Sequence, residues 1–472
     1  MHTFTHFIDG ESYSDPGQKY FETDAPHTGK PSSKVALGDA QTVERSVQSN
    51  LAAYDEWHAM DPLSRGRILI DLGRNLRAAK DRLAAMETEQ TGKTLAQAPV
   101  EIEAAAQYFE YYGGLTTLPR GDVIDNGPGF HAYTMHVPFG VVGVITPWNL
   151  PINQSARAIA PALAMGNVVT AKPSEFTSGT SVELAKIAIE SGLPKGVLNV
   201  VLGQGADCGA ALVSHPKVRK VCFTGSVRAG REIGHIAADK IIPLTLELGG
   251  KSANILFEDA NLDDAIPVAL AAFATNAGQV CTAGTRLLVQ NSIRDEVVKR
   301  LVALAKDAKV GPGVDAATGA ITTPDQLARV NSYFEIAKQD GATCELGGVP
   351  TDNGDGRYAP ITIYSNVTPD MRIAQEEIFG PVLSIMSFDT EEDAIEIANG
   401  TDYGLAAALW TQDLGRAHRV AAAMEAGYTS VNHYSPSNFL PFGGFKDSGY
   451  GREKGIEALH HYCQTKSINI KL

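Results

Sequence analysis

The stretch VVGVIT at residues 141–146 opens the part of the sequence that decides the fold. Four more apolar runs rich in β-branched residues follow it: VVTAK (168–172), VLNVVLG (197–203), VRKVCFTG (218–225) and PLTLEL (243–248). Helical patterns lie between these runs, at residues 154–165, 181–190, 206–213 and 227–238. Apolar strands that alternate with helices predict a parallel, doubly wound, Rossmann-like α/β sheet with right-handed crossovers.

Polar side chains and a glycine stand where the predicted strands end. Ligands of doubly wound sheets bind beyond the carboxyl ends of the strands. The residues in these places are Asn149, Lys172, Gly225, Ser226 and Glu247. Their common position predicts that they contribute to one site.

A second α/β unit is expected from Ser252 onward. Its predicted strands cover residues 253–257, 285–290, 382–388 and 428–432, and its predicted helices include residues 262–275, 293–308 and 391–399. The seam between the two units is expected near Gly249 and Gly250. Because Glu247 precedes this seam and Cys281 follows it, a site between the units is predicted.

The N-terminal part predicts a hairpin and three helices. Asp9-Gly10 between two short extended runs is typical of a hairpin turn. Amphipathic helical patterns follow at residues 42–58, 63–89 and 95–112.

Two isolated segments at residues 131–137 and 465–472 alternate like strands and need partners. We expect an arm that pairs with itself and with another subunit, and an internal edge ribbon is the equally weighted alternative.

The composition restricts the class of protein. The chain has 472 residues and a formal net charge of −14, which argues against a nucleic-acid partner. No run approaches the ~20 apolar residues of a membrane span, and the first residues lack the pattern of a signal peptide. The five cysteines are scattered, without a Cys-x-x-Cys pair, which argues against a disulfide framework, a zinc site or any other metal site. We expect a soluble protein of the cytoplasm, where thiols stay reduced.

A candidate nucleophile, base and oxyanion donor are spread along the chain. Cys281 in NAGQVCT lies on a glycine-containing connection, which gives a sulfur nucleophile access, whereas the other four cysteines are interpreted as packing residues. Glu247 in LELGGKS is the candidate base, because a carboxylate in an apolar seam has a raised pKa. Pairing of Glu247 with Lys251 or with an arginine is the alternative. Asn149 in TPWNLP is the candidate oxyanion donor.

Two further motifs predict contacts to a dinucleotide. Ser226 in FTGS opens a helix, whose N-terminus can hold a pyrophosphate, although a simple N-cap is the alternative. Lys172 and Glu175 in AKPSE can bind a ribose diol, with a solvated ion pair as the alternative. A carboxylate there would repel a 2′-phosphate, which favours NAD over NADP. No Gly-x-Gly-x-x-Gly motif follows a strand.

These motifs together resemble the aldehyde dehydrogenase superfamily over essentially the whole chain. The motifs are TPWN, FTGS, LELGGKS, NAGQVC, EEIFGP (376–381) and PFGGFKDSGYGRE (441–453). The resemblance implies an NAD-binding domain at 1–118 and 139–250, a catalytic domain at 251–463, and an oligomerisation arm at 119–138 and 464–472. It also implies a homodimer or a homotetramer.

The resemblance assigns roles to individual residues. Cys281 matches the nucleophile, Glu247 the general base, Asn149 the oxyanion donor, and Glu453 a second glutamate that relays protons in some members. The residues that match cofactor contacts are Ile145, Thr146, Trp148, Lys172, Ser174, Glu175, Gly205, Gly225, Ser226, Leu248, Glu377 and Phe379.

The implied reaction is oxidation of a small-molecule aldehyde to a carboxylic acid. The Cys281 thiolate forms a thiohemiacetal, hydride passes to NAD, and Glu247 activates the water that hydrolyses the thioester. Members that transfer the acyl group to coenzyme A generally lack a glutamate at this place, so the hydrolytic branch is expected. A coenzyme-A-acylating relative, an NADP-preferring relative and a non-catalytic structural or binding member are the alternatives.

The substrate is expected to be a small aromatic or polar aldehyde. Gln154 and Arg157 are polar residues on the helix that lines the substrate entry of the family, and Tyr434 and Phe439 are candidate aromatic walls. Arg157 resembles an arginine of semialdehyde-type and of salicylaldehyde- or vanillin-type members. Thr275 stands where the semialdehyde members carry a second arginine, so an acidic-tail semialdehyde is the alternative substrate. For Arg157 itself, the alternative is a helix-surface residue paired with a carboxylate.

Overall fold

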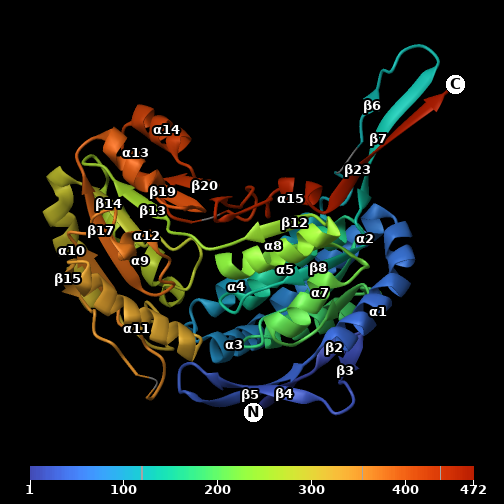
Figure 1. Cartoon of the computed structure of the whole chain (residues 1–472), viewed down its shortest axis with the longest axis horizontal. Helices are drawn as coiled ribbons and strands as arrows, with labels where there is room; N and C mark the ends of the chain where they lie inside the picture. Colours follow the sequence, from blue (N-terminus) through green and yellow to red (C-terminus); the bar gives the residue numbers. More distant parts are fainter. Residues whose placement is uncertain (119–120, 353, 436) are drawn as a thin grey trace.

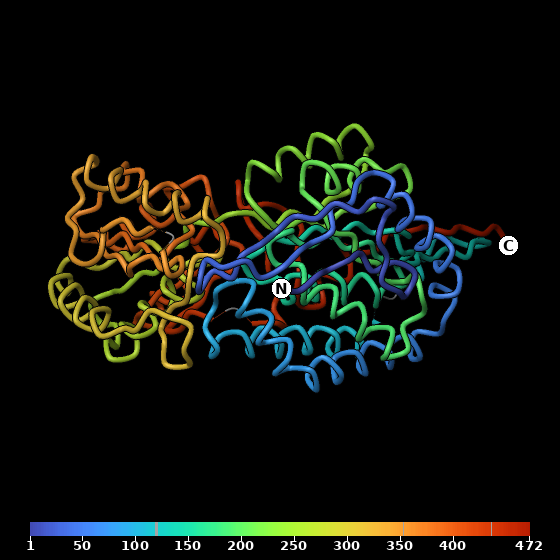
Figure 2. Tube along the Cα trace, turned by 90° about the horizontal axis from the view of Figure 1, so that it is seen from below, coloured from blue at the N-terminus to red at the C-terminus, as the bar shows by residue number. Residues whose placement is uncertain are grey.

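The computed structural model describes residues 1–118, 121–352, 354–435 and 437–472. It contains two α/β units and a β ribbon that projects from one of them (Figure 1). The C-terminus lies at the tip of this ribbon, and the view at right angles shows the ribbon extending away from both units (Figure 2). No helix within the described residues is long and apolar enough to cross a membrane.

The first unit is built on an eight-stranded sheet with the order β22-β12-β11-β8-β9-β10-β2-β3. Its strands are β2 (His6–Ile8), β3 (Glu11–Tyr13), β8 (Val141–Ile145), β9 (Val168–Lys172), β10 (Leu198–Val200), β11 (Val218–Thr224), β12 (Leu244–Glu247) and β22 (Gly449–Tyr450). The five strands from β12 to β10 are parallel. The predicted doubly wound α/β fold class is therefore confirmed.

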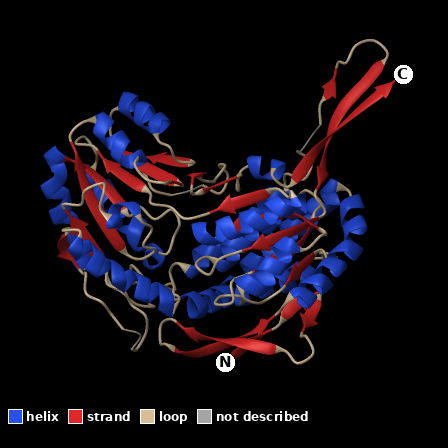
Figure 3. Ribbon diagram, in the orientation of Figure 1, coloured by secondary structure: helices blue, strands red, loops and turns tan. Residues whose placement is uncertain are grey.

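Two groups of helices cover this sheet (Figure 3). The first group contains α2 (Pro62–Ala78), α3 (Lys80–Thr91), α4 (Ala98–Gly113), α5 (Pro151–Ala164) and α6 (Gly179–Glu190). The second contains α1 (Ala40–Ala59), the π-helical turn η1 (Gly205–Gly209), α7 (Ala210–Ser214) and α8 (Val227–Lys240). Because β8 and β9 are covered in this way, every residue in both strands is buried, which explains their continuous apolar character.

The second unit has a seven-stranded sheet with the order β15-β16-β17-β14-β13-β19-β20. Its strands are β13 (Ala253–Leu256), β14 (Arg286–Gln290), β15 (Thr343–Leu346), β16 (Thr362–Ser365), β17 (Val382–Phe388), β19 (Ala406–Trp410) and β20 (Tyr428–Val431). Its helices are α9 (Leu262–Ala274), α10 (Arg294–Lys306), α11 (Pro324–Gln339), α12 (Arg372–Gln375), α13 (Glu391–Asn399) and α14 (Leu414–Ala423). The chain passes from the first sheet to the second between Glu247 and Ala253, where the seam was predicted.

The projecting ribbon consists of β6 (Val123–Ile124), β7 (Phe130–Pro138) and β23 (Cys463–Lys471). Strand β23 pairs antiparallel with β7 over its whole length. The predicted pairing of the two isolated segments with each other is therefore present, while pairing with another subunit stays a prediction. The predicted start of the arm at residue 119 lies outside the described residues.

Three features differ from the expected elements. The helix predicted at 63–89 is two helices, since α2 ends at Ala78 and α3 begins at Lys80. Both helices contact α4 and α6, but α2 also contacts α5, whereas α3 contacts strand β4 (Lys19–Ala25), a difference that apolar periodicity does not reveal. The strands β1 (His2–Phe4), β4 (Lys19–Ala25) and β5 (Lys30–Leu37) form a sheet that was not predicted.

The third difference concerns the end of the predicted catalytic domain at residue 463. Strand β22 pairs with β12 of the first sheet, and the short helix α15 (Glu457–His460) contacts α5. Ala458, Leu459 and Tyr462 belong to the hydrophobic core of the first unit. The chain therefore returns to the first unit from about Gly449, and this return brings Glu453 into the neighbourhood of β12. We therefore propose that the catalytic domain ends before residue 463, at about Gly449, and that the segment after it belongs to the first unit.

Candidate active site

Cys281 follows a strained turn at the end of α9. Asn276, Ala277 and Gly278 all have left-handed backbone conformations, with φ of 53°, 54° and 70°. Such conformations are costly for residues with a Cβ atom and are found where the surrounding structure holds them. At Gly278 a Cβ atom would lie 2.1 Å from the carbonyl oxygen of Gly380, so only glycine fits there.

The side chain of Gln279 fixes this turn from within the protein. It is fully buried, and its amide donates to the carbonyl oxygen of Asn276 at 2.9 Å. Its carbonyl oxygen accepts from the backbone N–H of Thr322 at 2.9 Å. The sequence motif suggested access around Cys281, whereas the structure shows that Gln279 holds the backbone of the nucleophile in one position.

Cys281 lies where two cavities meet. A cavity of about 530 Å³ is lined by residues that follow strands of the first sheet and by residues of the second unit. A second cavity of about 330 Å³ is lined by residues of α4, α5 and the C-terminal segment. Among the described residues, Cys281 and Gln154 are the two that line both of them. A ligand in either cavity therefore lies against the same cysteine residue.

The larger cavity gathers several of the predicted cofactor contacts. Those that line it are Trp148, Gly225, Ser226, Leu248, Glu377 and Phe379, together with Asn149. Trp148 and Phe379 meet edge to face with ring centroids 5.4 Å apart. Ser226 is the N-cap of α8, because its hydroxyl accepts from the N–H of Ala229 at 3.3 Å. The interpretation of Ser226 as an N-cap therefore holds. Because Ser226 and Val227 line the cavity, the N-terminus of α8 lies at the cavity wall.

The carboxylate of Glu377 contacts Gly249 and Gly250, the two glycines between the first and the second unit. It accepts from the N–H of Gly250 at 3.1 Å, and a Cβ atom on Gly249 would come within 2.3 Å of it. Burial raises the pKa of Glu377 to about 7. The two glycines were expected to let the backbone approach a ligand. In the structure, the missing side chain of Gly249 leaves room for the Glu377 carboxylate, and that of Gly250 leaves room for the backbone of Cys281.

The remaining predicted cofactor contacts lie near the same sheet edge but do not line the larger cavity. They are Ile145, Thr146, Lys172, Ser174, Glu175 and Gly205. Lys172 is paired in register with Ile145, and its ammonium donates to the carbonyl oxygen of Gly203 at 2.7 Å. Glu175 lies 3.8 Å from this ammonium. Because Lys172 is buried, the alternative of a solvated ion pair does not describe this group.

Glu247 ends β12 as a buried and unpartnered carboxyl group. Neither of its side-chain oxygens has a hydrogen-bond partner among the described residues. Burial raises the pKa of Glu247 well above its usual range, and the nearby charge of Glu453 raises it further. Lys251 does not pair with Glu247, and burial lowers the pKa of Lys251 to about 7. An unpartnered buried carboxyl group is costly in a stable core, and it is typical of a group that acts on a ligand or a water molecule.

Behind Glu247 lies a buried cluster of Arg157, Glu453 and Cys222. Arg157 forms an ion pair with Glu453 and donates to the hydroxyl of Thr224 at 3.3 Å. The thiol of Cys222 donates to the other oxygen of Glu453 at 2.9 Å. Arg157 is thus paired with a carboxylate, but it is buried, so the interpretation as a helix-surface residue is wrong. Cys222 is more than a packing residue, because it holds Glu453.

The groups around the Cys281 sulfur favour its protonated form in the free protein. Burial raises the pKa of the Cys281 thiol to about 11, although the guanidinium of Arg157 acts in the opposite direction. Asn149 is anchored by donation of its amide to the carbonyl oxygen of Gln279 at 2.9 Å. An amide N–H that remains on this nitrogen is available to an oxygen atom beside Cys281.

The smaller cavity contains two of the four predicted substrate contacts. Gln154 and Arg157 line it, together with Asn153, Asn438, Phe442 and Lys454. Tyr434 lines neither cavity, and its hydroxyl donates to the carbonyl oxygen of Thr282 at 2.7 Å. Phe439 is 55% exposed and packs edge to face on Tyr111. The structure therefore brings Gln154 and Arg157 to the cavity and places Tyr434 and Phe439 outside its wall.

The family of the chain is established by comparison with known proteins. The sequence model described as "Aldehyde dehydrogenase family" matches residues 13–468. The chain belongs to this family. The resemblance expected from the motifs is confirmed, and so is the expectation that this aldehyde dehydrogenase is an oxidoreductase acting on aldehydes.

Relatives of this aldehyde dehydrogenase are similar over almost the whole length. The betaine aldehyde dehydrogenase of Bacillus subtilis (strain 168) is 39% identical, over 98% of this chain and 96% of that protein. The NAD-dependent aldehyde dehydrogenase of Sinorhizobium meliloti has a TM-score of 0.98 at 36% identity, over 100% of this chain and 95% of that one. The indole-3-acetaldehyde dehydrogenase of P. syringae, in complex with NAD+ and IAA, has a TM-score of 0.96 at 39% identity, over 99% and 96%.

The sequence analysis of this aldehyde dehydrogenase missed Lys454, which lines the smaller cavity, and Cys222, which holds Glu453. Lys454 has a left-handed backbone with φ of 58°, and it lines the smaller cavity with its ammonium 4.9 Å from the centre of the Phe442 ring. Burial lowers the pKa of Lys454 to about 8. Cys222 was missed because its neighbour Glu453 is 231 positions away in the sequence. Lys454 directly follows Glu453 in the sequence, and this adjacency to a predicted site residue is the signal that could have pointed to Lys454.

Proposed function

We propose that the chain oxidises an aldehyde to the carboxylic acid with NAD, through a thioester on Cys281. The observation that carries this proposal is that Cys281 belongs to the wall of two cavities. The larger cavity has the features of a dinucleotide site and the smaller one is sized for a small organic molecule. A nucleophile between them can contact a substrate carbonyl while a cofactor lies on the other side.

The first step assigned to the protein is addition of sulfur to the carbonyl carbon. The Cys281 thiol first releases its proton to solvent, the thiolate then forms the S–C bond, and the carbonyl π electrons move onto oxygen. Asn149 then stabilises the oxyanion with its remaining amide N–H. A donor of this kind contributes roughly 3 kcal/mol to the stability of such a transition state. Because Gln279 holds both the turn and the Asn149 amide, the donor and the nucleophile are positioned by the same residue.

The residues of the larger cavity fit a bound NAD. Gly225 and Ser226 present the N-terminus of α8 to a pyrophosphate, and Glu377 presents a buried carboxylate that can accept from a ribose hydroxyl. Trp148 and Phe379 provide aromatic surface. NAD, when bound, supplies the hydride acceptor of the reaction. Glu175 near Lys172 supports NAD over NADP, because its carboxylate would repel a 2′-phosphate.

Glu247 is assigned the hydrolysis of the thioester. As carboxylate it takes a proton from water, the water oxygen bonds to the acyl carbon, and the S–C bond breaks to release the acid and the Cys281 thiolate. The raised pKa of Glu247 makes it a stronger base once it is deprotonated. Glu453 acts on this step through its charge, which raises the pKa of Glu247. A proton relay through Glu453 stays a prediction.

The smaller cavity favours a neutral, small aromatic or polar aldehyde. Its one aromatic wall, Phe442, already has the guanidinium of Arg157 at 5.4 Å and the ammonium of Lys454 at 4.9 Å from its ring centre. The cavity is lined by both signs of charge, because Glu101 and Glu103 of α4 also belong to its wall. At the aromatic ring itself, a cationic substrate would meet two cations instead of a free face. Amide groups from Asn153, Gln154 and Asn438 supply hydrogen bonds to a polar substrate.

An acidic-tail semialdehyde is less well supported. Recognition of a carboxylate by arginine relies on a bidentate pair. In this chain the guanidinium of Arg157 is paired with Glu453 and bonded to Thr224. A substrate carboxylate would have to displace Glu453 from a buried ion pair, which is unfavourable.

We further propose a homo-oligomer, a dimer or a tetramer, that acts in the cytoplasm. The ribbon of β6, β7 and β23 exposes apolar side chains at positions where a second subunit can cover them: Val123, Ile124, Phe130, Met135, Ile470 and Leu472. Exposed apolar patches of this kind are typical of protein interfaces. The five free cysteines are consistent with a reducing compartment.

The reaction is tested by the initial rate of reduced-nicotinamide formation with NAD across neutral aromatic, neutral polar, cationic and acidic-tail aldehydes. We expect the neutral aromatic or polar group to have the highest kcat/KM. Formation of the carboxylic acid, measured in the same samples, should match the NAD reduced. Folded protein with a reduced Cys281 that turns over none of the four groups would contradict the proposed reaction.

Replacement of Arg157 by glutamine is expected to change the selectivity for charged substrates. Removal of this cation frees one face of Phe442, and a desolvated cation–π contact corresponds to about a tenfold change in affinity. We therefore expect the ratio of kcat/KM for cationic over neutral aldehydes to rise about tenfold. The ratio is measured within one variant, so a general loss of activity cancels.

Arg416→Gln is the matched control for the Arg157 experiment. Arg416 also lies over a phenyl ring, 4.6 Å from the centre of Phe257, but it lines neither cavity. The control should keep the selectivity of the unchanged chain. Equal selectivity of the Arg157 variant and the unchanged chain would exclude Arg157 as a determinant of substrate charge.

A further inference from the structure

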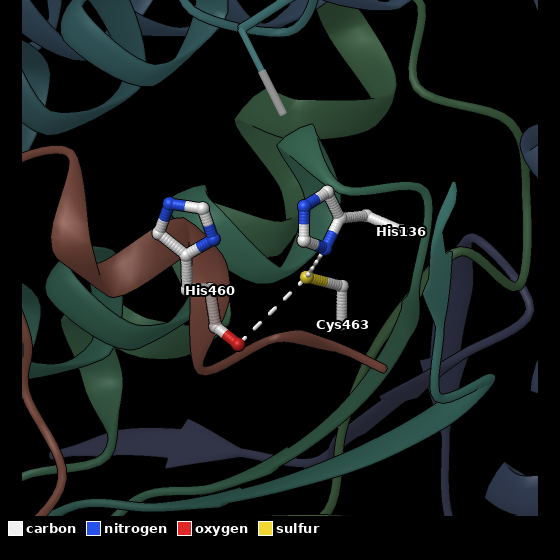
Figure 4. Close-up of side chains that lie close together, drawn as sticks. All are labelled: His136, His460 and Cys463. Carbon is white, nitrogen blue, oxygen red and sulfur yellow. Dashed lines mark hydrogen bonds between the residues drawn. The ribbon is translucent and has the colours of Figure 1, made fainter. Parts of the chain in front are cut away.

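Two histidines and a cysteine come together at the base of the projecting ribbon (Figure 4). None of these three residues lines either cavity. His136 lies in β7, His460 is the last residue of α15, and Cys463 is the first residue of β23. Their ligand atoms all lie within 4.8 Å of one another. Among the described residues, this is the one group of three or more histidine, cysteine or acidic side chains that converges in this way.

The backbone explains why these three side chains meet. His136 pairs with Thr465 across the ribbon, and Cys463 lies two residues before Thr465 on the same strand. Residues two apart on a strand share a face, so Cys463 is a diagonal neighbour of His136. The chain turns between α15 and β23, and this turn places His460 beside Cys463, three residues later. The site is therefore formed by three elements that are fixed relative to one another.

The spacing of these groups is close to that of ligands around a tetrahedral metal ion. The sulfur of Cys463 lies 3.5 Å from Nδ1 of His136. Zinc bonds of about 2.3 Å to sulfur and about 2.0 Å to nitrogen, at a tetrahedral angle, place the two ligand atoms about 3.5 Å apart. His460 is exposed, so its ring can rotate to complete the set, and the exposure also gives an ion access from solvent.

We propose that His136, His460 and Cys463 bind a zinc ion, with the fourth position open to water. A thiolate and two imidazoles are the ligand types that Zn²⁺ prefers over Mg²⁺ or Ca²⁺. Among the described residues, the hydrogen-bond contacts of the Cys463 sulfur are long: 3.5 Å to Nδ1 of His136 and 3.7 Å to the carbonyl oxygen of His460. Binding of an ion therefore replaces weak interactions and not a strong hydrogen-bond network.

The proposed ion would connect the ribbon to the body of the protein. His136 and Cys463 belong to the ribbon strands, whereas His460 follows Ala458 and Leu459, which are fully buried in the core of the first unit. A ligand that binds only the folded chain stabilises it. Bound zinc is therefore expected to raise the melting temperature and to order the base of the ribbon.

The test is titration of the full-length chain with Co²⁺ after treatment with a chelator. Co²⁺ replaces Zn²⁺ in such sites and gives a thiolate-to-cobalt absorption band, which reports a sulfur ligand. The titration is done on a Cys281→Ser background, so that the thiol of the active site does not compete. We expect one equivalent of Co²⁺ per chain with the thiolate band, and displacement of Co²⁺ by Zn²⁺.

Three further substitutions decide the assignment. Cys463→Ser should abolish the thiolate band, and His460→Gln, an exposed change that leaves the core intact, should weaken binding at least about tenfold, since it removes one of three ligands. Cys344→Ser removes an exposed thiol elsewhere and should leave the titration unchanged. Absence of the band in the parent chain, or an unchanged titration in His460→Gln, would overturn the proposal. A zinc-dependent rise in melting temperature in the parent and not in His460→Gln would support it.

Discussion

Replacement of Cys281 by alanine is expected to lower kcat for aldehyde oxidation by at least about 10⁴-fold, because no other group at the junction of the cavities can form the thioester. Binding of NAD should be retained, since Cys281 is one of many residues that line the larger cavity. The measurement combines the steady-state rate with titration of NAD binding. A loss of rate with intact NAD binding separates the role of the sulfur from a failure to fold.

Cys344→Ala is the matched control for this variant. Cys344 is exposed on the second unit and lines neither cavity, so its loss should leave kcat within about twofold. Residual oxidation by the Cys281→Ala variant at a rate close to that of the control would exclude sulfur catalysis.

The same sulfur should show a steep dependence on pH in the free protein. Because the pKa of Cys281 is raised to about 11, the thiolate fraction and the rate of alkylation rise about tenfold per pH unit between pH 7 and 10. An alkylation rate at Cys281 that is flat over this range would mean that the thiolate is already formed at neutral pH.

Replacement of Glu247 by glutamine is expected to stop the reaction after the first half. Glutamine preserves the size of the side chain but cannot take a proton from water, so steady-state kcat should fall about 10²- to 10⁴-fold. Hydride transfer does not need this base. We therefore expect a burst of about one equivalent of reduced nicotinamide per site, and mass spectrometry should find the acyl group on Cys281.

The burst distinguishes a lost base from a damaged site. Glu335→Gln, an exposed change on α11, should show steady turnover without accumulation of the acyl-enzyme. If the Glu247 variant lost the burst together with the turnover, Glu247 would be needed before the thioester forms, and the assignment to hydrolysis would be wrong.

Much of this fold could be predicted because local pattern and topology agree. The buried strands β8 and β9 are continuous apolar runs, and their ends place Asn149 and Lys172 at the ligand-binding edge of the sheet. Glu247 and Cys281 were recognised from motifs that are contiguous in the sequence. Their roles stay proposals, while the fold class and the family are established.

Other parts could not be predicted because they depend on contacts between distant segments. The pairing of β22 with β12 brings Glu453 beside Arg157 and Cys222, and no local pattern encodes a contact across 231 positions. The helices α2 and α3 share α4 and α6 as neighbours and differ in contacting α5 and β4, which are distant in the sequence. The group of His136, His460 and Cys463 joins positions 136 and 463 through strand pairing, so the search for Cys-x-x-Cys spacing did not detect it.

The shared position of Cys281 has a consequence for inhibitor design. The two cavities have different walls apart from Cys281 and Gln154, so a single molecule can be built with a different group for each. One part of the molecule would imitate the nicotinamide half of the dinucleotide, and the other would fit the smaller cavity. A mild electrophile between the two parts would form a covalent bond with the sulfur of Cys281. Selectivity would come from the smaller cavity, whose wall combines amide, charged and aromatic side chains, and potency from the covalent bond.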